Sequence, residues 1–257
     1  MSQSFYTVTE VAGNKISSEQ IDRMYHRYYW ALGKTKNKKV IELACGTGPG
    51  LGLINKEASS LRASDIDESL LSIAKKYYKD RIIFDKIDAL SMPYKNNSID
   101  VIILFEAIYY LENIQIFIDE CIRVLKSNGR LLISTANKDL YDFNPSPYSF
   151  KYLGVRELNE LLSKNNFDCS FYGYLSINEI SLLQKLLRPI RKLMTKLNLF
   201  PKSMKSKEFL KKLIFGNLII MPNELNSNYK YLLPKILNKN NPSYEYKVIY
   251  CDAKIKK

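Results

Sequence analysis

A short apolar strand that runs into a glycine-rich turn constrains the fold of this chain more than any other feature. Residues 40–44 read Val-Ile-Glu-Leu-Ala, and Gly46, Gly48 and Gly50 follow at alternate positions, with a helix expected over about 50–57. A turn without side chains at the carboxyl end of a parallel strand lets a ligand approach the backbone. The helix behind the turn presents its positive amino-terminal end to that ligand. The pattern predicts a ligand site at one edge of a parallel sheet.

Two later strands also end in an acid. A strand over 61–65 ends in Asp65, nineteen positions after Gly46, and a strand over 81–87 is followed by Asp88. A glycine turn alone is often a tight corner, and an acid alone is often a helix cap. Because the carboxyl ends of parallel strands meet at one edge of a sheet, these acids are expected beside Glu42.

Apolar strands and amphipathic helices alternate along most of the chain, which favours a doubly wound α/β sheet with right-handed crossovers. We expect helices over 17–32, 50–57, 68–78, 113–126 and 155–164, and strands over 39–44, 61–65, 81–87, 99–105, 130–136, 167–175 and 244–253. The run Val-Ile-Ile-Leu-Phe at 101–105 is typical of a strand covered on both faces.

Composition narrows the classes of protein. The chain opens with no basic-then-apolar leader and has no run of about 18 apolar residues, so a cytoplasmic protein is expected. Its four cysteines, at 45, 121, 169 and 251, share no metal-ligand or redox spacing, and we expect them to be buried thiols. His26 is the single histidine, so no histidine-rich metal site is expected, and no metal is assigned.

The positive charge gathers at the carboxyl-terminal end. The net charge is +13, and residues 176–257 hold 17 Lys and Arg against 5 Asp and Glu. The sequence predicts an amino-terminal helical cap over 1–36, a core over 37–175, a basic helical insertion over 176–243 and the last core strand over 244–257. In the insertion, apolar residues from Ile180 to Leu197 form one helical stripe, and a second helix is expected over about 206–215. This asymmetry suits an anionic substrate, nucleic acid, a membrane surface, or a merely solvated lysine-rich face.

The segment Val-Ile-Glu-Leu-Ala-Cys-Gly-Thr-Gly resembles motif I of the class I S-adenosylmethionine-dependent methyltransferases, and the later segments follow in order. Ala-Ser-Asp-Ile-Asp at 63–67 resembles the ribose-binding acid, and Asp-Ala-Leu-Ser-Met-Pro-Tyr at 88–94 resembles the adenine segment. Residues 120–134 resemble the helix, turn and strand that follow in that family. The dinucleotide fingerprint needs a third glycine where this chain has Leu51. The resemblance implies a Rossmann-like, seven-stranded, mostly parallel sheet with an antiparallel last strand and S-adenosylmethionine as methyl donor.

The resemblance also implies which residues meet the donor. In this family an amino-terminal helix often folds over the donor, which here places Arg27 near the donor carboxylate and Tyr28 beside it. The full set expected to bind the cofactor is Arg27, Tyr28, Glu42, Ala44, Gly46, Gly48, Asp65, Ile66, Asp88, Ala89 and Phe105.

Methyl transfer to a hydroxyl or an amine also requires removal of a proton. The candidate bases are Glu106, directly after the fourth strand, His26 on the amino-terminal helix, and Asp142; Tyr109 is the further catalytic candidate. A proline-containing loop over 137–150 is a candidate lid. We expect Tyr110, Asn144, Tyr148 and Arg188 to contact the acceptor.

The acceptor is the least constrained part of the interpretation. Phe-Glu-Ala-Ile-Tyr-Tyr-Leu at 105–111 and Phe-Asn-Pro-Ser-Pro-Tyr-Ser at 143–149 resemble bacterial methyltransferases of small-molecule and glycan pathways. This favours O-methylation of a small anionic acceptor such as a sugar-nucleotide, a phosphate ester or a surface-polysaccharide precursor. An RNA or protein methyltransferase and a non-catalytic S-adenosylmethionine-binding protein are alternatives. No Asn/Asp-Pro-Pro-Tyr/Phe tetrapeptide follows the fourth strand, which disfavours base methylation. Peripheral membrane contact through 179–197 stays open, as does the oligomeric state.

Overall fold

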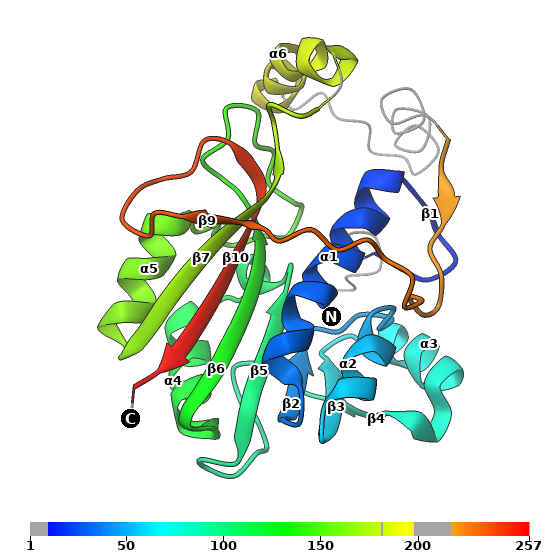
Figure 1. The fold of residues 1–257 in the computed structure, drawn as a ribbon, viewed down its shortest axis with the longest axis vertical. Coiled ribbons are helices and arrows are strands. Elements are labelled where there is room, and N and C mark those ends of the chain that lie inside the picture. The colour runs from blue at the N-terminus through cyan, green and yellow to red at the C-terminus, as the bar shows by residue number, and fades with distance from the viewer. Residues whose placement is uncertain (1–9, 181, 198–216, 257) are drawn as a thin grey trace.

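The protein folds around one large twisted sheet with helices on both faces (Figure 1). The computed structural model describes residues 10–180, 182–197 and 217–256. The helices are α1 (Ser18–Thr35), α2 (Leu51–Glu57), α3 (Glu68–Tyr78), α4 (Ile114–Val124), α5 (Val155–Lys164) and α6 (Leu182–Lys196), with short 3₁₀ turns η1 (Lys79–Arg81) and η2 (Ile108–Tyr110). The strands are β1 (Lys15–Ile16), β2 (Lys39–Leu43), β3 (Ser60–Asp65), β4 (Ile83–Lys86), β5 (Ile99–Phe105), β6 (Leu125–Ala136), β7 (Phe167–Ser176), β8 (Ile219–Ile220), β9 (Lys235–Leu237) and β10 (Tyr246–Ile255).

The sheet order places a switch point at its centre. Within the described residues the sheet has eight strands in the order β4-β3-β2-β5-β6-β10-β7-β9. Strand β2 pairs in parallel with β3 on one side and with β5 on the other. The chain runs outward from β2 through β3 to β4 and then crosses back to β5 on the other side of β2. Ligands of doubly wound sheets bind in the crevice that this reversal creates at the carboxyl ends of the strands.

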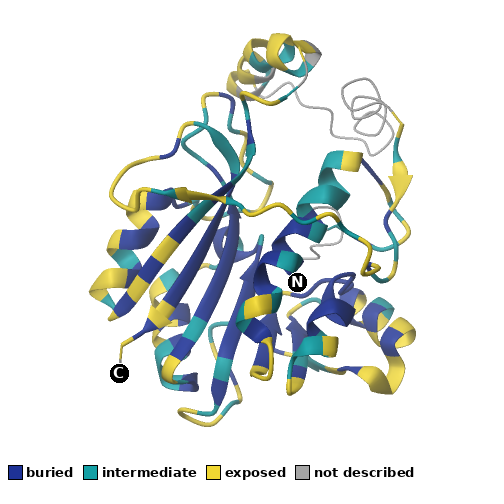
Figure 2. Ribbon diagram, in the orientation of Figure 1, coloured by how far each residue is buried: buried dark blue, intermediate teal, exposed yellow. Residues whose placement is uncertain are grey.

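Both faces of the sheet are covered, so its central strands are buried (Figure 2). Along β5, Val101 and Ile103 point into a core with α1, α2 and α3, whereas Ile102 and Leu104 point into a core with α4 and α5. Because both sides of each strand meet apolar side chains, the strands are continuous apolar runs. The four cysteines are buried free thiols, as predicted.

Most element boundaries lie within a few residues of those predicted from the sequence; the main difference is at β6. The strand predicted over 130–136 begins directly after α4, at Leu125. Its pairing with β5 shifts register between Ile99 and Val101, and Asn128 adopts a left-handed φ of 63° in the irregular stretch. The Asn128-Gly129 turn therefore lies inside one long strand, in a stretch whose pairing with β5 is irregular.

The last strand confirms the predicted topology, but the strand count was one too low. Strand β10 inserts between β6 and β7 and runs antiparallel to both. The eighth strand, β9, pairs antiparallel with the edge of β7. It comes from the segment predicted to be a helical insertion, whose short polar sequence around Lys235 carries little strand signal.

The segment between β7 and β10 also reaches the amino-terminal part of the chain. Its α6 occupies the predicted amphipathic stretch, and β8 pairs antiparallel with β1. The helix predicted over 206–215 lies outside the described residues.

Candidate functional site

The switch point of the sheet holds a cavity of about 510 Å³. Its floor is the carboxyl ends of β2, β3 and β5, and α1, η2 and the loop after β4 form its walls. The cavity-lining residues expected from the sequence are Arg27, Tyr28, Glu42, Ala44, Gly46, Asp65, Ile66, Asp88, Ala89, Phe105, Glu106, Tyr109 and Tyr110. Long-range strand pairing thus brings together residues that are more than eighty positions apart.

The glycine-rich turn is shaped by backbone conformation and by Tyr28. Ala44 and Gly46 both adopt left-handed φ values, 54° and 59°. A Cβ atom at Gly50 would lie 2.1 Å from the Tyr28 ring, so only glycine lets α1 pack over the turn. The amino-terminal helix therefore closes directly on the turn.

Asp65 is held at the turn by backbone donors. Its Oδ2 accepts from the Gly46 N–H over 2.8 Å, and its Oδ1 accepts from the Asp67 N–H over 2.9 Å. Burial raises the pKa of this carboxyl, and the two backbone donors oppose the rise. A carboxylate offers about four acceptor positions, so the backbone donors leave acceptor capacity for a ligand diol.

Glu42 lies deeper in the same cavity. The Tyr28 hydroxyl donates to Glu42 Oε1 over 2.5 Å. In the described part of the chain, Glu42 Oε2 is buried without a hydrogen-bond partner. Burial raises the pKa of Glu42 to about 7, although Tyr28 and the positive charge of Arg27 lower it. A buried acceptor with no partner is costly unless a ligand completes it.

Arg27 does not stand free for a ligand carboxylate. Its guanidinium donates to Glu10 Oε2 over 2.8 Å, and both side chains line the cavity. Its Nε is buried and without a partner among the described residues. Arg27 thus lines the cavity, and Glu10 pairs with the guanidinium that was expected to meet the donor carboxylate.

Glu106 is the centre of a polar cluster at the opposite wall. It follows β5 in a left-handed conformation with a φ of 53°. Ser134 Oγ donates to Glu106 Oε1 over 2.8 Å, the Tyr109 hydroxyl donates to Oε2 over 3.3 Å, and Arg23 Nη2 lies 3.6 Å from Oε1. Burial raises the pKa of Tyr109, which keeps it a donor. Strained backbone of this kind gathers at functional sites.

His26 is not part of the cavity, which corrects its assignment as a candidate base. Its side chain is fully buried, with Nδ1 2.9 Å from the Tyr250 hydroxyl and Nε2 2.8 Å from the Leu232 carbonyl oxygen. The ring also stacks on Tyr174. Because a carbonyl oxygen only accepts, Nε2 carries the proton. Burial lowers the pKa of His26 to about 4, so the ring is neutral and structural.

Three other predicted contacts also lie outside the cavity lining. Gly48, with a φ of 72°, shapes the turn, and its carbonyl oxygen accepts from the Tyr78 hydroxyl over 2.7 Å. Asn144 and Tyr148 are exposed on the loop after β6. Phe150, at the end of that loop, lines the cavity instead.

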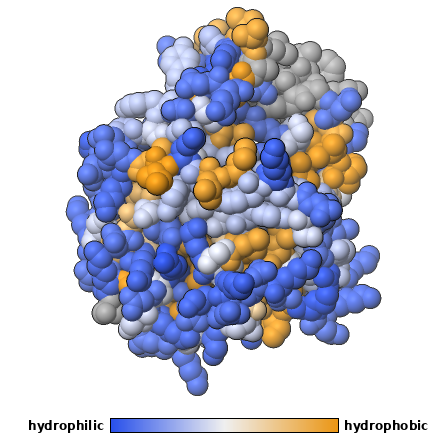
Figure 3. All heavy atoms as spheres, in the orientation of Figure 1, coloured by the Kyte–Doolittle hydropathy of each residue, from blue (hydrophilic) through white to orange (hydrophobic). Residues whose placement is uncertain are grey.

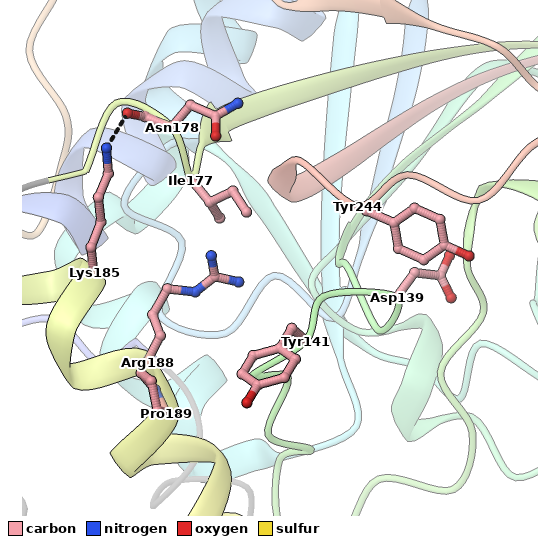
Figure 4. A pocket seen from close by; sticks show the side chains of 8 residues that line it. All are labelled: Asp139, Tyr141, Ile177, Asn178, Lys185, Arg188, Pro189 and Tyr244. Atoms are coloured by element: carbon pink, nitrogen blue, oxygen red, sulfur yellow. Dashed lines mark hydrogen bonds between the residues drawn. The ribbon is translucent and has the colours of Figure 1, made fainter.

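Arg188 belongs to a second, open cavity of about 670 Å³ (Figure 4). Its Nε and Nη2 both donate to Asp142 Oδ1, over 3.0 and 2.8 Å. Figure 4 shows Arg188 reaching from α6 toward Tyr141 and the turn at Ile177. Arg188 therefore lies outside the first cavity, and its charge is paired with that of Asp142. Asp142 is likewise engaged in structure and is not a base at the first cavity.

Several residues that line the cavity were not predicted from the sequence, among them Arg23, Phe150 and Glu10. Arg23 lies one helical turn before Arg27 on the same face of α1, and this spacing was a usable signal. Phe150 is the last residue of the predicted lid loop. An aromatic residue in such a loop, exposed here, is a weaker sequence signal for a binding site. Glu10 enters from a loop that carries no local pattern, so only tertiary structure reveals it.

These residues fit S-adenosylmethionine. Its ribose hydroxyls need a strand-end carboxylate, which Asp65 supplies, and its positive groups suit the unsatisfied oxygen of Glu42. Asp88 and Ala89, in the loop after β4, line the part of the cavity expected to hold the base. Ile66 and Phe105 add apolar surface at the ends of β3 and β5.

The sheet order, the antiparallel last strand and the acid beside the glycine turn define a class I methyltransferase-like domain. Residues 41–133 match the family model described as a methyltransferase domain. Residues 41–133 are therefore similar to methyltransferase domains, and the fold around them is the Rossmann-like fold of class I methyltransferases.

Curated relatives support this assignment over part of their length. A probable S-adenosylmethionine-dependent methyltransferase from Mycolicibacterium smegmatis is 30% identical over 135 residues, covering 51% of this chain and 52% of the relative. A ubiquinone/menaquinone biosynthesis C-methyltransferase from Shewanella pealeana is 27% identical over 179 residues, covering 63% and 68%. The chain spans about half the length of the first curated relatives that it matches.

Solved structures agree in fold. The YcgJ protein of Bacillus subtilis superposes with a TM-score of 0.59 at 14% identity, covering 91% of this chain and 99% of its own. A methyltransferase from Archaeoglobus fulgidus gives 0.57 at 14% identity, covering 92% and 93%. The [4+2]-cyclase SpnF gives 0.58 at 14% identity, covering 96% and 88%. Since one of these proteins is a cyclase by name, the fold alone does not decide the reaction.

The described residues contain no cluster of three or more His, Cys, Asp or Glu side chains able to hold a metal ion. None of the described helices is both long enough and apolar enough to cross a bilayer.

Proposed function

We propose that this chain transfers the methyl group of S-adenosylmethionine to an oxygen atom of a small polar acceptor. The observation that carries the proposal is the arrangement of Glu42, Asp65 and the left-handed turn at Gly46 around one cavity. Asp65 is pre-oriented by two backbone donors, and Glu42 keeps a buried acceptor without a partner in the described part of the chain. Both features suit a nucleoside with positively charged groups.

The residues around the cavity exclude water, orient Glu42 and accept a proton. When bound, the donor supplies a methyl group activated for in-line displacement. Tyr28 and Phe105 pack edge to face and shield that part of the cavity from water, and the Tyr28 hydroxyl orients Glu42. Glu106 faces the same cavity and is positioned by Ser134, Tyr109 and Arg23 to accept the proton of an acceptor hydroxyl.

The acceptor side of the cavity is aromatic with a cation nearby. Tyr109, Tyr110 and Phe150 line it, and Arg23 is the cation that borders Glu106. Aromatic faces suit a sugar ring or another flat polar molecule, and Arg23 suits a phosphate or carboxylate. This supports a sugar-nucleotide, a phosphate ester or a polysaccharide precursor as acceptor. RNA or protein methylation and donor binding without turnover are the alternatives.

Donor binding is tested by calorimetry with S-adenosylhomocysteine. Asp65→Asn removes the charge that strengthens the ribose bonds and is expected to weaken binding at least about tenfold. Asp85→Asn is the matched control, because Asp85 lies on the neighbouring β4, pairs with Arg62 and does not line the cavity. Equal affinities in wild type and Asp65→Asn would contradict the assigned ribose contact.

The acceptor is tested by release of S-adenosylhomocysteine in the presence of compound pools. Nucleotide sugars and sugar phosphates are expected to give turnover, with mass spectrometry locating the new O-methyl group. If turnover occurs only with a demethylated quinone, an RNA or a protein, the proposed acceptor class is wrong but the proposed methyl transfer is supported. Tight donor binding without turnover in any pool would favour the non-catalytic alternative.

A further inference from the structure

Helix α6 exposes a narrow apolar face. Successive helical residues are rotated by about 100°, so Leu182, Leu186, Ile190, Leu193 and Leu197 fall within an arc of about 80°. These five side chains are between 53% and 78% exposed. Leu197 continues the last turn, since its N–H donates to the Leu193 carbonyl over 2.9 Å. Figure 3 shows apolar surface gathered where α6 forms the top of the molecule. Scattered exposed leucines are ordinary, but an aligned stripe marks an interaction surface.

A row of lysines borders this face on one side. Lys185, Lys192 and Lys196 fall within an arc of about 40° next to the apolar stripe, and all three are exposed. Lys185 donates to the Asn178 carbonyl and Lys192 lies over the Tyr141 ring, which are surface contacts that a stronger anion replaces at little cost. No acidic residue occurs between positions 182 and 196 of the sequence.

The opposite side of α6 is fastened to the protein. Arg188 lies there and is paired with the buried Asp142, and Leu187 and Met194, which flank the apolar stripe, are partly buried. The helix is therefore held with its apolar stripe and its lysine row outward. The open cavity of Figure 4 lies along the basic side, where Lys185, Arg188 and Pro189 form one wall and Tyr141 and Tyr244 stand opposite.

The combination of an apolar stripe and bordering lysines distinguishes between partners. An interfacial helix buries apolar side chains at the level of the acyl chains, while long lysines reach back to the headgroups. A second copy packed on this face would bring two purely basic helices together. A single-stranded nucleic acid is held by stacking on aromatic side chains, and this face is aliphatic.

We propose that α6 docks the protein on the surface of an anionic phospholipid bilayer. Leu182, Leu186, Ile190 and Leu193 enter the interface, and the lysine row binds the negative headgroups. This inference is independent of the methyl-transfer proposal.

Docking by α6 turns the first cavity toward the bilayer side. Helix α6 follows the carboxyl end of β7, beyond the edge of the sheet that carries the cavity (Figure 1). The loop after β6 joins the two regions, because its Asp142 holds α6 and its Phe150 lines the cavity.

Vesicle co-sedimentation of the full chain tests the proposal. Vesicles of equal parts phosphatidylglycerol and phosphatidylcholine are expected to bind the protein at least about tenfold more strongly than vesicles of phosphatidylcholine alone. Raising the salt from about 0.1 M to about 1 M shortens the screening length from about 10 Å to about 3 Å and is expected to weaken binding. Equal binding to both vesicle types, or none to either, would overturn the proposal.

Two variants separate the apolar from the electrostatic contribution. Leu186→Ser, Ile190→Ser and Leu193→Ser together are expected to reduce binding at least about tenfold, and Lys185→Gln, Lys192→Gln and Lys196→Gln together to reduce both binding and its salt dependence. The matched control replaces three exposed lysines elsewhere, Lys38→Gln, Lys56→Gln and Lys76→Gln, and is expected to retain binding.

Folding of every variant is checked by donor-product affinity, which is expected to equal that of wild type. If all the variants are folded and bind vesicles as wild type does, α6 does not contact the membrane. A loss as large in the control as in the α6 lysine variant would mean that net charge alone attracts the protein. Two further results would overturn the bilayer proposal. If wild type is a dimer and the serine variant is a monomer, the apolar face binds a second copy of the chain. If the protein binds single-stranded RNA and not vesicles, the face binds RNA.

Discussion

The Tyr28 hydroxyl donates to the buried Glu42 carboxylate over 2.5 Å, and the second oxygen of that carboxylate has no partner in the described structure. The pair joins α1 to the end of β2 and sets the charge at the floor of the cavity. The pKa of Glu42 is raised to about 7 chiefly by burial. Several measurable properties of the protein therefore depend on the charge of one residue.

Stability is predicted to depend on the protonation of Glu42. The folded carboxyl titrates near 7 and the unfolded one near 4.5, so the folded state holds an extra proton between these values. Stability from this group therefore falls as pH rises from about 4.5 to about 7. Glu42→Gln is expected to remove the fall and to raise the free energy of unfolding above pH 7 by on the order of 3 kcal/mol. Urea unfolding across this range checks the slope, and a variant no more stable than wild type at about pH 8 would contradict it.

His26 is predicted to change the free energy of unfolding with pH in the opposite direction. Its pKa is about 4 when folded and 6.5 when unfolded, so the unfolded state binds the extra proton and stability rises with pH between these values. His26→Gln, whose amide reaches toward the Leu232 carbonyl, is expected to remove that rise and leave the fall due to Glu42. Its turnover per folded molecule is expected to stay within about fivefold of wild type, because the ring lies outside the cavity. A loss of about a hundredfold in well-folded protein would restore His26 as a base.

Donor affinity is predicted to fall on acidification. The donor is positively charged and favours ionised Glu42, so binding below the pKa of about 7 requires loss of a proton. Calorimetry is expected to show affinity falling by up to about tenfold per pH unit below 7, with the fall absent in Glu42→Gln. A pH-independent wild-type affinity would place Glu42 outside the binding equilibrium.

Glu10 is predicted to compete with the donor carboxylate for Arg27. Glu10→Gln removes the competing charge, and the affinity for S-adenosylhomocysteine is expected to rise about three- to tenfold. Methylthioadenosine, which lacks the amino-acid end of the donor, is the control ligand and is expected to bind both proteins alike. Weaker binding of S-adenosylhomocysteine to the variant would show that Glu10 supports the donor.

Glu106 is predicted to act in the chemical step. Once an acceptor is identified, Glu106→Gln is expected to lower kcat at least about a hundredfold with donor affinity retained, because the amide cannot accept the proton. Glu112→Gln, at the exposed rim of the same cavity, is the control and is expected to change kcat less than about threefold. Comparable kcat values in both variants would make Glu106 a positioning residue.

The strand-end residues of the site were predictable because sheet topology is strongly constrained. A parallel α/β sheet brings all its carboxyl ends to one edge, so Glu42, Asp65 and Asp88 meet once the order of strands and helices is known. The glycine turn was predictable for a local reason, since the left-handed φ of Gly46 leaves little choice of residue.

Other parts of the site depend on contacts between distant segments, which sequence pattern does not encode. His26 and Arg27 are neighbours on α1, yet one is buried against Tyr250 while the other faces the cavity with Glu10. Arg188 was expected at the acceptor because its charge was visible, but the partner that offsets it, Asp142, lies 46 positions away.

The sequence by itself determined the fold class and the acids at the strand ends, because these follow from local periodicity and the few topologies open to alternating elements. The antiparallel last strand was expected only from the resemblance to the class I methyltransferases. Tertiary structure alone decided which charges are paired, which histidine nitrogen carries the proton and which face of α6 is exposed. Those properties depend on burial and on distances between groups far apart in the chain, and the energies of charged groups vary steeply with both.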